Sequence, residues 1–163
     1  YEATCDPLGD AGYEHYEVSS WARPGERCRH NLEYWENGSW WAFGPSAVGQ
    51  LRDATGLGGW RWRNVARLGD WLDTGPWPPV IDVERIDADT ARAEGFMLGL
   101  RRLEGLDAAR LAALLDGDPE AERRWAVLED AVATGRLERT ADGGLRLTRA
   151  GLLLADEVVG ALL

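Results

Sequence analysis

Lysine is absent from this 163-residue sequence, so all 18 basic side chains are arginines. They are outnumbered by 28 aspartates and glutamates, and the formal net charge is −10. A general nucleic-acid-binding surface needs clustered basic residues to neutralise phosphates, so this balance argues against that class. No apolar run approaches the roughly 18 residues that a membrane-spanning helix requires. We therefore expect a globular protein that does not bind nucleic acid.

Cysteine, histidine and methionine are also scarce. Two cysteines, Cys5 and Cys28, could form at most one disulfide, and such a sparse count fits a reducing cytoplasm better than a secreted framework. The sequence begins with tyrosine, and its single methionine is Met97. We therefore expect a piece of a longer protein, with a further N-terminal part.

Tryptophan is distributed unevenly along the chain. Eight of the nine tryptophans precede residue 80, and Trp125 alone follows it. The turn-forming segment from Gly75 to Pro79 stands where the composition changes. Such proline-rich segments often mark boundaries, so we predict one domain over residues 1–77 and a second over residues 80–163.

The first 29 residues predict a helix followed by a strand. Residues 1–11 have a helical pattern that ends at Gly12, and residues 13–18 alternate as a strand does. A helix, a glycine turn and a strand form the unit from which parallel sheets and barrels are built. We expect residues 19–29 to form a loop, which in such folds lies on the ligand-binding face.

The remainder of the first domain is a series of short elements. We expect a turn at Asn37, a buried strand over residues 40–43, an exposed edge strand over residues 60–63 and a helix over residues 65–73. Residues 44–49 are mostly small. They favour either a close approach of ligand to backbone or a tight turn that needs glycine only for its dihedral angles.

The second domain reads as helices plus one hairpin. Helical spacing predicts three helices, then a hairpin over residues 136–148, then a final helix that Thr148 caps. Asp107 and Asp118 are expected to begin the second and third helices. The expected core positions are Ala93, Phe96, Met97, Leu100, Leu111, Leu114, Leu115, Ala121, Trp125, Leu128, Val132, Leu152, Ala155, Val159 and Leu162. This order predicts a winged-helix-like domain, although its 11 arginines face 17 acidic residues, which disfavours DNA binding.

The segment from Cys28 to Trp35 concentrates unusual chemistry. It brings a thiol, an imidazole and two aromatic rings within eight residues. Such groups can ligate and stack on a planar metal-bearing ligand. The alternative is an aromatic segment that packs a domain edge, with His30 in a structural role.

These residues carry a family resemblance. The elements Gly12-Tyr13, Tyr16-Glu17-Val18-Ser19, Cys28-x-His30-Asn31-x-x-Tyr34-Trp35 and Gly44-Pro45-Ser46-Ala47 resemble HemW, the radical S-adenosylmethionine heme chaperone family. The His-Asn-x-x-Tyr-Trp element distinguishes HemW from the oxygen-independent coproporphyrinogen III oxidase HemN. The resemblance implies an α/β plus α fold: the C-terminal end of a radical S-adenosylmethionine partial (βα) barrel, followed by the winged-helix-like HemN C-terminal domain.

The resemblance also implies site residues. His30 would bind heme and ligate its iron, with Cys28 as an alternative ligand and Asn31, Tyr34 and Trp35 around it. Neutral imidazole and thiolate both ligate heme iron, which agrees with this mapping.

Two cofactors are implied for the full-length family members. Gly44, Ala47 and Val48 would line the S-adenosylmethionine site, although Ala42 and Val48 depart from the family pattern, which often has glycine and histidine there. A 4Fe-4S cluster would sit on a Cys-x-x-x-Cys-x-x-Cys motif that this sequence lacks. The cluster ligands are therefore expected outside the chain.

The leading hypothesis is a cytoplasmic heme chaperone whose partners are heme and recipient hemoproteins. A homodimer that covers exposed tryptophans, and peripheral membrane association through the recipients, are further expectations. The alternatives are a coproporphyrinogen III oxidase and a winged-helix transcription module. No acid–base pair or activated nucleophile stands out, so we expect the chain to have no catalytic activity alone.

Overall fold

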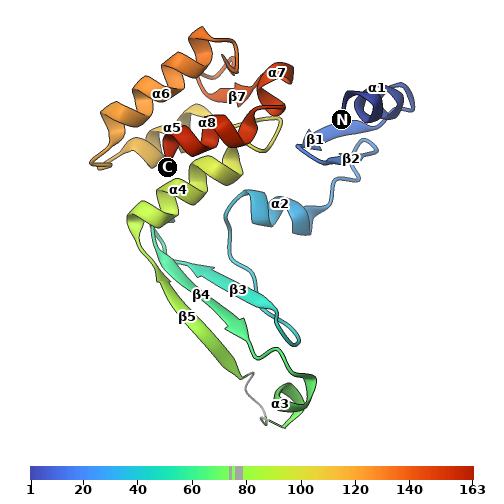
Figure 1. Cartoon of the computed structure of the whole chain (residues 1–163), viewed down its shortest axis with the longest axis vertical. Helices are drawn as coiled ribbons and strands as arrows, with labels where there is room; N and C mark the ends of the chain where they lie inside the picture. The colour runs from blue at the N-terminus through green and yellow to red at the C-terminus, as the bar shows by residue number, and fades with distance from the viewer. Residues whose placement is uncertain (74, 76–78) are drawn as a thin grey trace. The chain divides into compact units, whose positions relative to one another are not determined.

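The structure, a computed structural model, describes residues 1–73, 75 and 79–163 and has mixed α/β content. Figure 1 shows the elements in chain order. Every strand pair among the described residues is antiparallel, in sheets ordered β1-β2, β3-β4-β5 and β6-β7. The bounds are α1 (Glu2–Asp10), β1 (Glu14–Glu17), β2 (Ser20–Ala22), α2 (Arg29–Trp35), β3 (Val48–Arg52), β4 (Gly59–Asn64), α3 (Leu68–Leu72), β5 (Val80–Ile86), α4 (Ala88–Gly99), α5 (Ala108–Leu115), α6 (Ala121–Ala133), β6 (Leu137–Arg139), β7 (Leu145–Leu147), α7 (Arg149–Leu152) and α8 (Ala155–Leu162).

The chain divides into two compact units. Unit 1 contains Tyr1–Glu36 and Ala93–Leu163, and unit 2 contains Asn37–Arg92. This division differs from the expected boundary between residues 77 and 80, because β5 pairs with β4 across that position. Residues 74 and 76–78, where that boundary was expected, lie outside the described residues.

Unit 1 opens with the expected helix and strand, α1 and β1, joined by a turn in which Gly12 has a φ of 81°. The expected loop over residues 19–29 is corrected in part, because Ser20–Ala22 forms β2 and pairs antiparallel with β1. β1 also bonds to the later half of the chain: the Val18 amide donates to the Arg101 carbonyl at 3.1 Å. This pairing explains why the first 36 residues belong to the same unit as the C-terminal helices.

The C-terminal part of unit 1 follows the expected order of three helices, a hairpin and a final helical segment. The Asp107 side chain caps α5 by accepting from the Arg110 amide at 2.7 Å, and Thr148 caps α7 by accepting from Gly151 at 3.0 Å. The final helix is interrupted and forms α7 and α8. The core is Phe96, Leu100, Leu106, Leu111, Leu114, Leu128, Ala131, Leu137, Leu145, Leu147, Ala155, Val158, Val159 and Leu162.

One expected core position of α6 is wrong. Trp125 is 38% exposed, whereas its neighbour Arg124 is only 5% exposed. Arg124 is buried because its guanidinium pairs with Asp118 at 2.7 Å and its Nε donates to the Leu162 carbonyl at 3.0 Å. Trp125 is instead covered on one side by Arg139, whose guanidinium lies 5.8 Å from the indole ring.

Unit 2 is built on the three-stranded sheet, with β4 in the centre (Figure 1). The expected strand over residues 60–63 is present as part of β4, but its expected position at an edge is wrong, because β5, which we did not predict, pairs with it. Within the sheet Trp62 lies over Gly49, where a β-carbon would stand 2.3 Å from the indole. Only glycine permits this packing.

Two further expectations for unit 2 are corrected. Residues 40–43 form no strand beyond a single bridge from Trp40 to Gln50, and Phe43 is 82% exposed. The expected helix over residues 65–73 shortens to the five residues of α3. Its Leu68 and Leu72 are exposed, so this helix buries no apolar stripe in the described structure.

Candidate functional site

The Cys28–Trp35 segment of unit 1 folds as a short helix. Cys28 holds the N-cap position with extended dihedral angles, and α2 begins at Arg29. His30 and Tyr34 are one helical turn apart, so their side chains share a face. Tyr34 Oη lies 3.0 Å from His30 Nε2, and the two rings meet edge to face at 4.8 Å and 73°. The contact with Tyr34 on the same helical face thus fixes the orientation of the His30 imidazole.

The expected ligand atoms of this segment are accessible. Cys28 and His30 are both exposed, whereas Asn31, Tyr34 and Trp35 are half-buried. The Trp35 Nε1 atom is itself buried and has no hydrogen-bond partner among the described residues. An iron atom at His30 Nε2 would require the Tyr34 hydroxyl to turn away.

Ion pairs hold α2 at both ends within unit 1. Before the helix, Arg27 forms a short ion pair with Glu104. This hydrogen bond is the main reason why the pKa of the Glu104 carboxyl is lowered. After the helix, Arg102 pairs with the Glu36 carboxylate at 3.2 Å, and Arg110 donates to the Glu36 carbonyl at 3.0 Å. A cation at a helix C-terminus is favourable, so these contacts fix where the imidazole stands.

The Gly44–Val48 segment lies in unit 2 and forms a tight turn before β3. Gly44 has a φ of 93° and Ser46 a φ of 61°. A φ of 93° requires glycine whether or not a ligand is present, so the turn explanation for Gly44 is sufficient. Ala47 is half-buried, and the Val48 side chain is 37% exposed. His30 and Val48 belong to different units. The residues expected to bind heme and those expected to bind S-adenosylmethionine are therefore grouped separately.

Asn64 supports this turn from β4. Its side-chain amide donates to the Gly44 carbonyl at 2.9 Å and to the Ala42 carbonyl at 3.3 Å. Its Oδ1 atom is buried and has no partner among the described residues. An unpaired buried acceptor is costly, and Asn64 is 0% exposed, so this atom is a cost of the turn and offers no surface to a ligand.

Comparisons with known proteins show which family this chain is similar to. Residues 86–154 match the HemN C-terminal domain family model. The heme chaperone HemW of Mycobacterium tuberculosis (strain H37Rv) is 42% identical over 165 residues, a match that covers all of this chain. The chain resembles HemW along its whole length. HemW of Bacillus subtilis is 31% identical, also over all of the chain, and HemW of Escherichia coli is 46% identical over 27% of the chain. No solved structure matches the chain.

This chain spans about two fifths of the HemW proteins that it matches in full: 38% of the M. tuberculosis protein and 41% of the B. subtilis protein. The segment that matches the HemN C-terminal domain model has mixed α/β content, since α4, α5, α6 and the β6-β7 hairpin all fall in residues 86–154. The resemblance that the motifs predicted is therefore confirmed.

The HemW-like chain does not supply an iron–sulfur cluster site of its own. Its two cysteines are both free thiols, and they cannot supply the three cysteines of the Cys-x-x-x-Cys-x-x-Cys motif. The described residues contain no group of three or more histidine, cysteine or acidic side chains placed to hold a metal ion. In the part of the chain that the structure describes, no helix is both long and apolar enough to cross a membrane.

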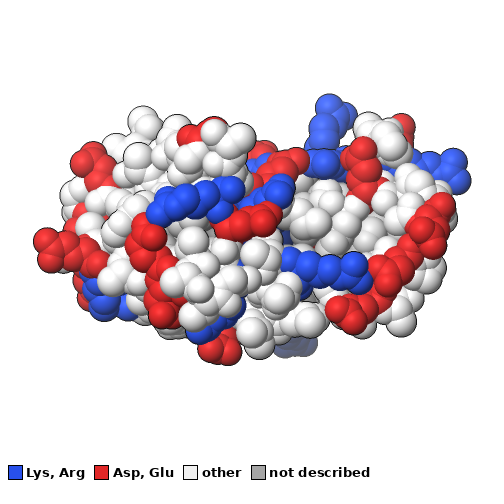
Figure 2. All heavy atoms as spheres, turned by 90° about the horizontal axis from the view of Figure 1, so that it is seen from above, with Lys and Arg blue, Asp and Glu red and all other residues white. Residues whose placement is uncertain are grey.

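Charge on the HemW-like chain is paired locally. Figure 2 shows arginine and acidic side chains interspersed over one face, without a continuous basic patch. On α6, which would be the recognition helix of a DNA-binding winged helix, Arg123 pairs with Glu120 at 2.5 Å and Arg124 with Asp118. These pairs leave little positive charge for phosphate, which does not favour the transcription-module alternative.

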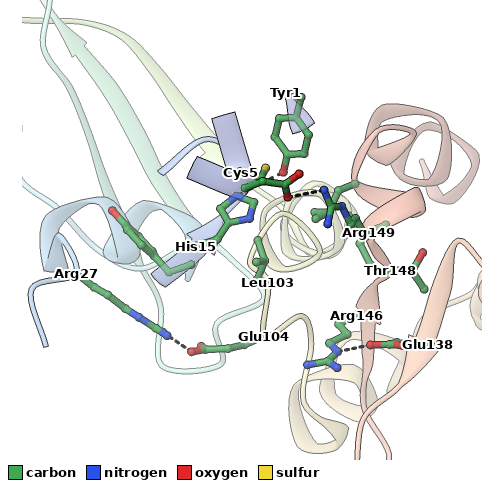
Figure 3. A pocket seen from close by; sticks show the side chains of 14 residues that line it. Tyr1, Cys5, His15, Arg27, Leu103, Glu104, Glu138, Arg146, Thr148 and Arg149 are labelled. Carbon is green, nitrogen blue, oxygen red and sulfur yellow. Dashed lines mark hydrogen bonds and ion pairs between the residues drawn. The ribbon is translucent and has the colours of Figure 1, made fainter. Parts of the chain in front are cut away.

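Sequence reasoning missed one feature of unit 1. Cys5 and His15, the other cysteine and histidine of the chain, line a cavity of about 540 Å³ (Figure 3). The residues that line it do not include His30 or Cys28. His15 was expected only as a strand residue. Because cysteine and histidine are scarce in the sequence, Cys5 and His15 could have been noted as candidates. That they lie close together depends on how α1 folds beside β1.

Proposed function

We propose that this chain is the heme-binding part of a heme chaperone, and that the full-length protein passes heme to recipient hemoproteins. The observation that carries the proposal is the exposed His30 imidazole on α2, a helix that ion pairs hold at both ends. The similar proteins of M. tuberculosis and B. subtilis are heme chaperones, which agrees with this chemistry.

In the proposed site, His30 ligates the heme iron through its imidazole. Neutral imidazole is a usual axial ligand of heme iron. The Tyr34 hydroxyl lies 3.0 Å from His30 Nε2, so it would have to turn away for iron to be held at that atom. Tyr34 and Trp35 flank the porphyrin, Asn31 offers an amide, and Cys28 is the alternative ligand.

The full-length protein would use two cofactors. The ligands of a 4Fe-4S cluster would lie outside this chain, because Cys5 and Cys28 cannot form the required motif. S-adenosylmethionine would approach Gly44, Ala47 and Val48.

The same proposal assigns the larger architecture. Residues 1–77 would complete a radical S-adenosylmethionine barrel, and residues 80–163 would form a winged-helix-like cover. We place the protein in the cytoplasm, where free thiols such as Cys5 and Cys28 persist. A homodimer, and contact with membranes through recipient hemoproteins, belong to the same proposal.

A heme-transfer assay distinguishes the proposed function from the alternative, an oxygen-independent coproporphyrinogen III oxidase. The full-length protein, loaded with heme, is mixed with an apo-hemoprotein, and recipient activity is followed over time. We expect transfer that falls sharply in His30→Ala and no conversion of coproporphyrinogen. Conversion of coproporphyrinogen without heme transfer would overturn the proposal and favour the oxidase.

A further inference from the structure

The cavity of unit 1 brings a second cysteine and histidine together. α1 supplies Cys5, and β1 supplies His15 (Figure 3). We propose that this cavity is a second iron-porphyrin site, with the His15 imidazole as axial ligand. The proposal rests on the proposed function, because it takes heme as the cargo, but it concerns residues to which no role was assigned above.

The His15 ring is fixed in orientation. It stacks on Trp21 of β2, with centroids 4.3 Å apart and planes 8° from parallel. The two residues are cross-strand partners in the β1-β2 hairpin, so the backbone register enforces the stack. Stacking covers a face of the ring and leaves its nitrogen atoms at the edge, where a metal ion binds in the ring plane. A ligand that is already oriented loses less conformational freedom when it binds.

The Nε2 atom of His15 is weakly engaged. Its neighbour, the Tyr1 hydroxyl, lies 3.4 Å away, longer than an ordinary hydrogen bond. Burial also lowers the pKa of His15, against smaller opposing contributions from hydrogen bonds to the backbone of Val18 and Glu17. The neutral form that ligates metals is therefore favoured at neutral pH.

Cys5 is the other potential ligand in this cavity, but it is engaged elsewhere. The Cys5 and Tyr1 side chains are hydrogen-bonded, and burial is the main reason why the pKa of Tyr1 is raised to about 12. Tyr1 therefore remains protonated at neutral pH and keeps this contact. We assign Cys5 to the cavity wall and the iron to His15.

The size of the cavity suits a porphyrin. Its volume of about 540 Å³ lies within the range of small-molecule sites, roughly 300–1,000 Å³. Apolar side chains and three ion pairs line it. The apolar side chains are Tyr16, Leu103, Leu147 and Leu152, and the ion pairs join Arg27 to Glu104, Arg146 to Glu138 and Arg149 to Asp6.

Arg146 and Arg149 can exchange their acidic partners for another anion with little loss of free energy. Arg146 pairs with Glu138 at 2.6 Å and Arg149 with Asp6 at 2.8 Å, and in both pairs the side chains are about half exposed or more. Exposed pairs of this kind contribute little to stability. A porphyrin carboxylate can therefore replace either acid and form the charge-assisted hydrogen bonds that arginine favours.

A heme titration in a His30→Ala background isolates this second site. The His15→Phe substitution keeps an aromatic ring against Trp21 but removes the nitrogen atoms. We expect the His30→Ala chain to bind one heme, and the added His15→Phe change to raise the Kd by about tenfold or more. Cys5→Ser, the matched control, should change the Kd by less than about twofold.

Two further probes keep the test decisive. Protoporphyrin without iron cannot be ligated, so it should bind the His30→Ala chain equally well with and without His15→Phe. If His15→Phe disturbs folding, the exposed rim variant Arg146→Glu decides instead, and it should weaken heme binding several-fold at low salt.

The second site is overturned if the His30→Ala chain binds no heme, or if His15→Phe or its substitute Arg146→Glu leaves the Kd unchanged in that background. The stacked rings would then be structural only. A His15→Phe chain with His30 intact that still binds one heme supports the first site independently, so failure of one site is distinguishable from failure of the other.

Discussion

Removal of the Asp118 carboxylate is expected to destabilise unit 1 more than any change at an exposed ion pair. Asp118 and Arg124 meet at 2.7 Å, with only 1% and 6% of their side chains exposed. Asp118 Oδ1 also accepts from the Glu120 amide at 3.0 Å at the start of α6. Asp118→Ala would leave the Arg124 guanidinium buried without its counter-ion.

The magnitude follows from that burial. Breaking a buried pair by removing one partner costs about 3–5 kcal/mol, a large share of the roughly 5–15 kcal/mol by which native domains are stable. At about 2–4 °C per kcal/mol for a chain of this length, the Tm should fall by about 6–20 °C. Urea unfolding followed by far-UV circular dichroism measures the same loss as a lower midpoint.

Two controls make the test specific. Glu138→Ala breaks the Arg146 pair, whose side chains are 49% and 46% exposed, and should cost less than about 1 kcal/mol. Replacement of both buried partners, Asp118→Leu with Arg124→Met, should cost less than Asp118→Ala because no charge is stranded. Equal losses from Asp118→Ala and Glu138→Ala would refute the reasoning.

Two further predictions concern packing and pH. Gly49→Ala should displace Trp62 and shift tryptophan fluorescence, because a β-carbon would stand 2.3 Å from the indole, whereas Gly69→Ala, with nothing within 4 Å, should not. Hydrogen bonding to Arg27 lowers the pKa of Glu104 in the folded protein. The contribution of the Glu104 carboxylate to folding stability is therefore complete above about pH 4.3. It is lost as the pH falls through the lowered pKa of Glu104 in the folded protein. Urea midpoints measured at about pH 6 and about pH 3 should differ less in Glu104→Gln than in the unsubstituted chain; equal differences would contradict this cause.

Several signals that lie close together in the sequence were predicted correctly, although the N-cap of α6 is Glu120 and not the expected Asp118. Asp107 and Thr148 cap helices as expected, and the hairpin over residues 136–148 is confirmed by the pairing of β6 with β7. Caps and turns depend on a few neighbouring residues, so the sequence alone specifies them. The HemW resemblance rested on motifs of the same short range.

Features that depend on distant partners were not predicted. β4 was expected at an edge because Val80–Ile86 was not predicted to be a strand. The pairing of this strand, β5, with β4 places β4 in the centre of the sheet. Arg124 was not expected to be buried, because a charge enters a core only where a partner such as Asp118 meets it. The approach of Cys5 to His15 likewise depends on the tertiary fold.

Heme titration of this chain, followed by Soret absorbance, tests the central claim most directly. We expect saturable binding by the unsubstituted chain and a markedly weaker complex at the first site in His30→Ala, with residual binding attributable to His15. A titration of His15→Phe against His30→Ala/His15→Phe separates the two contributions. Equal heme affinity in those last two chains would contradict the assignment of His30 as the iron ligand and transfer it to Cys28.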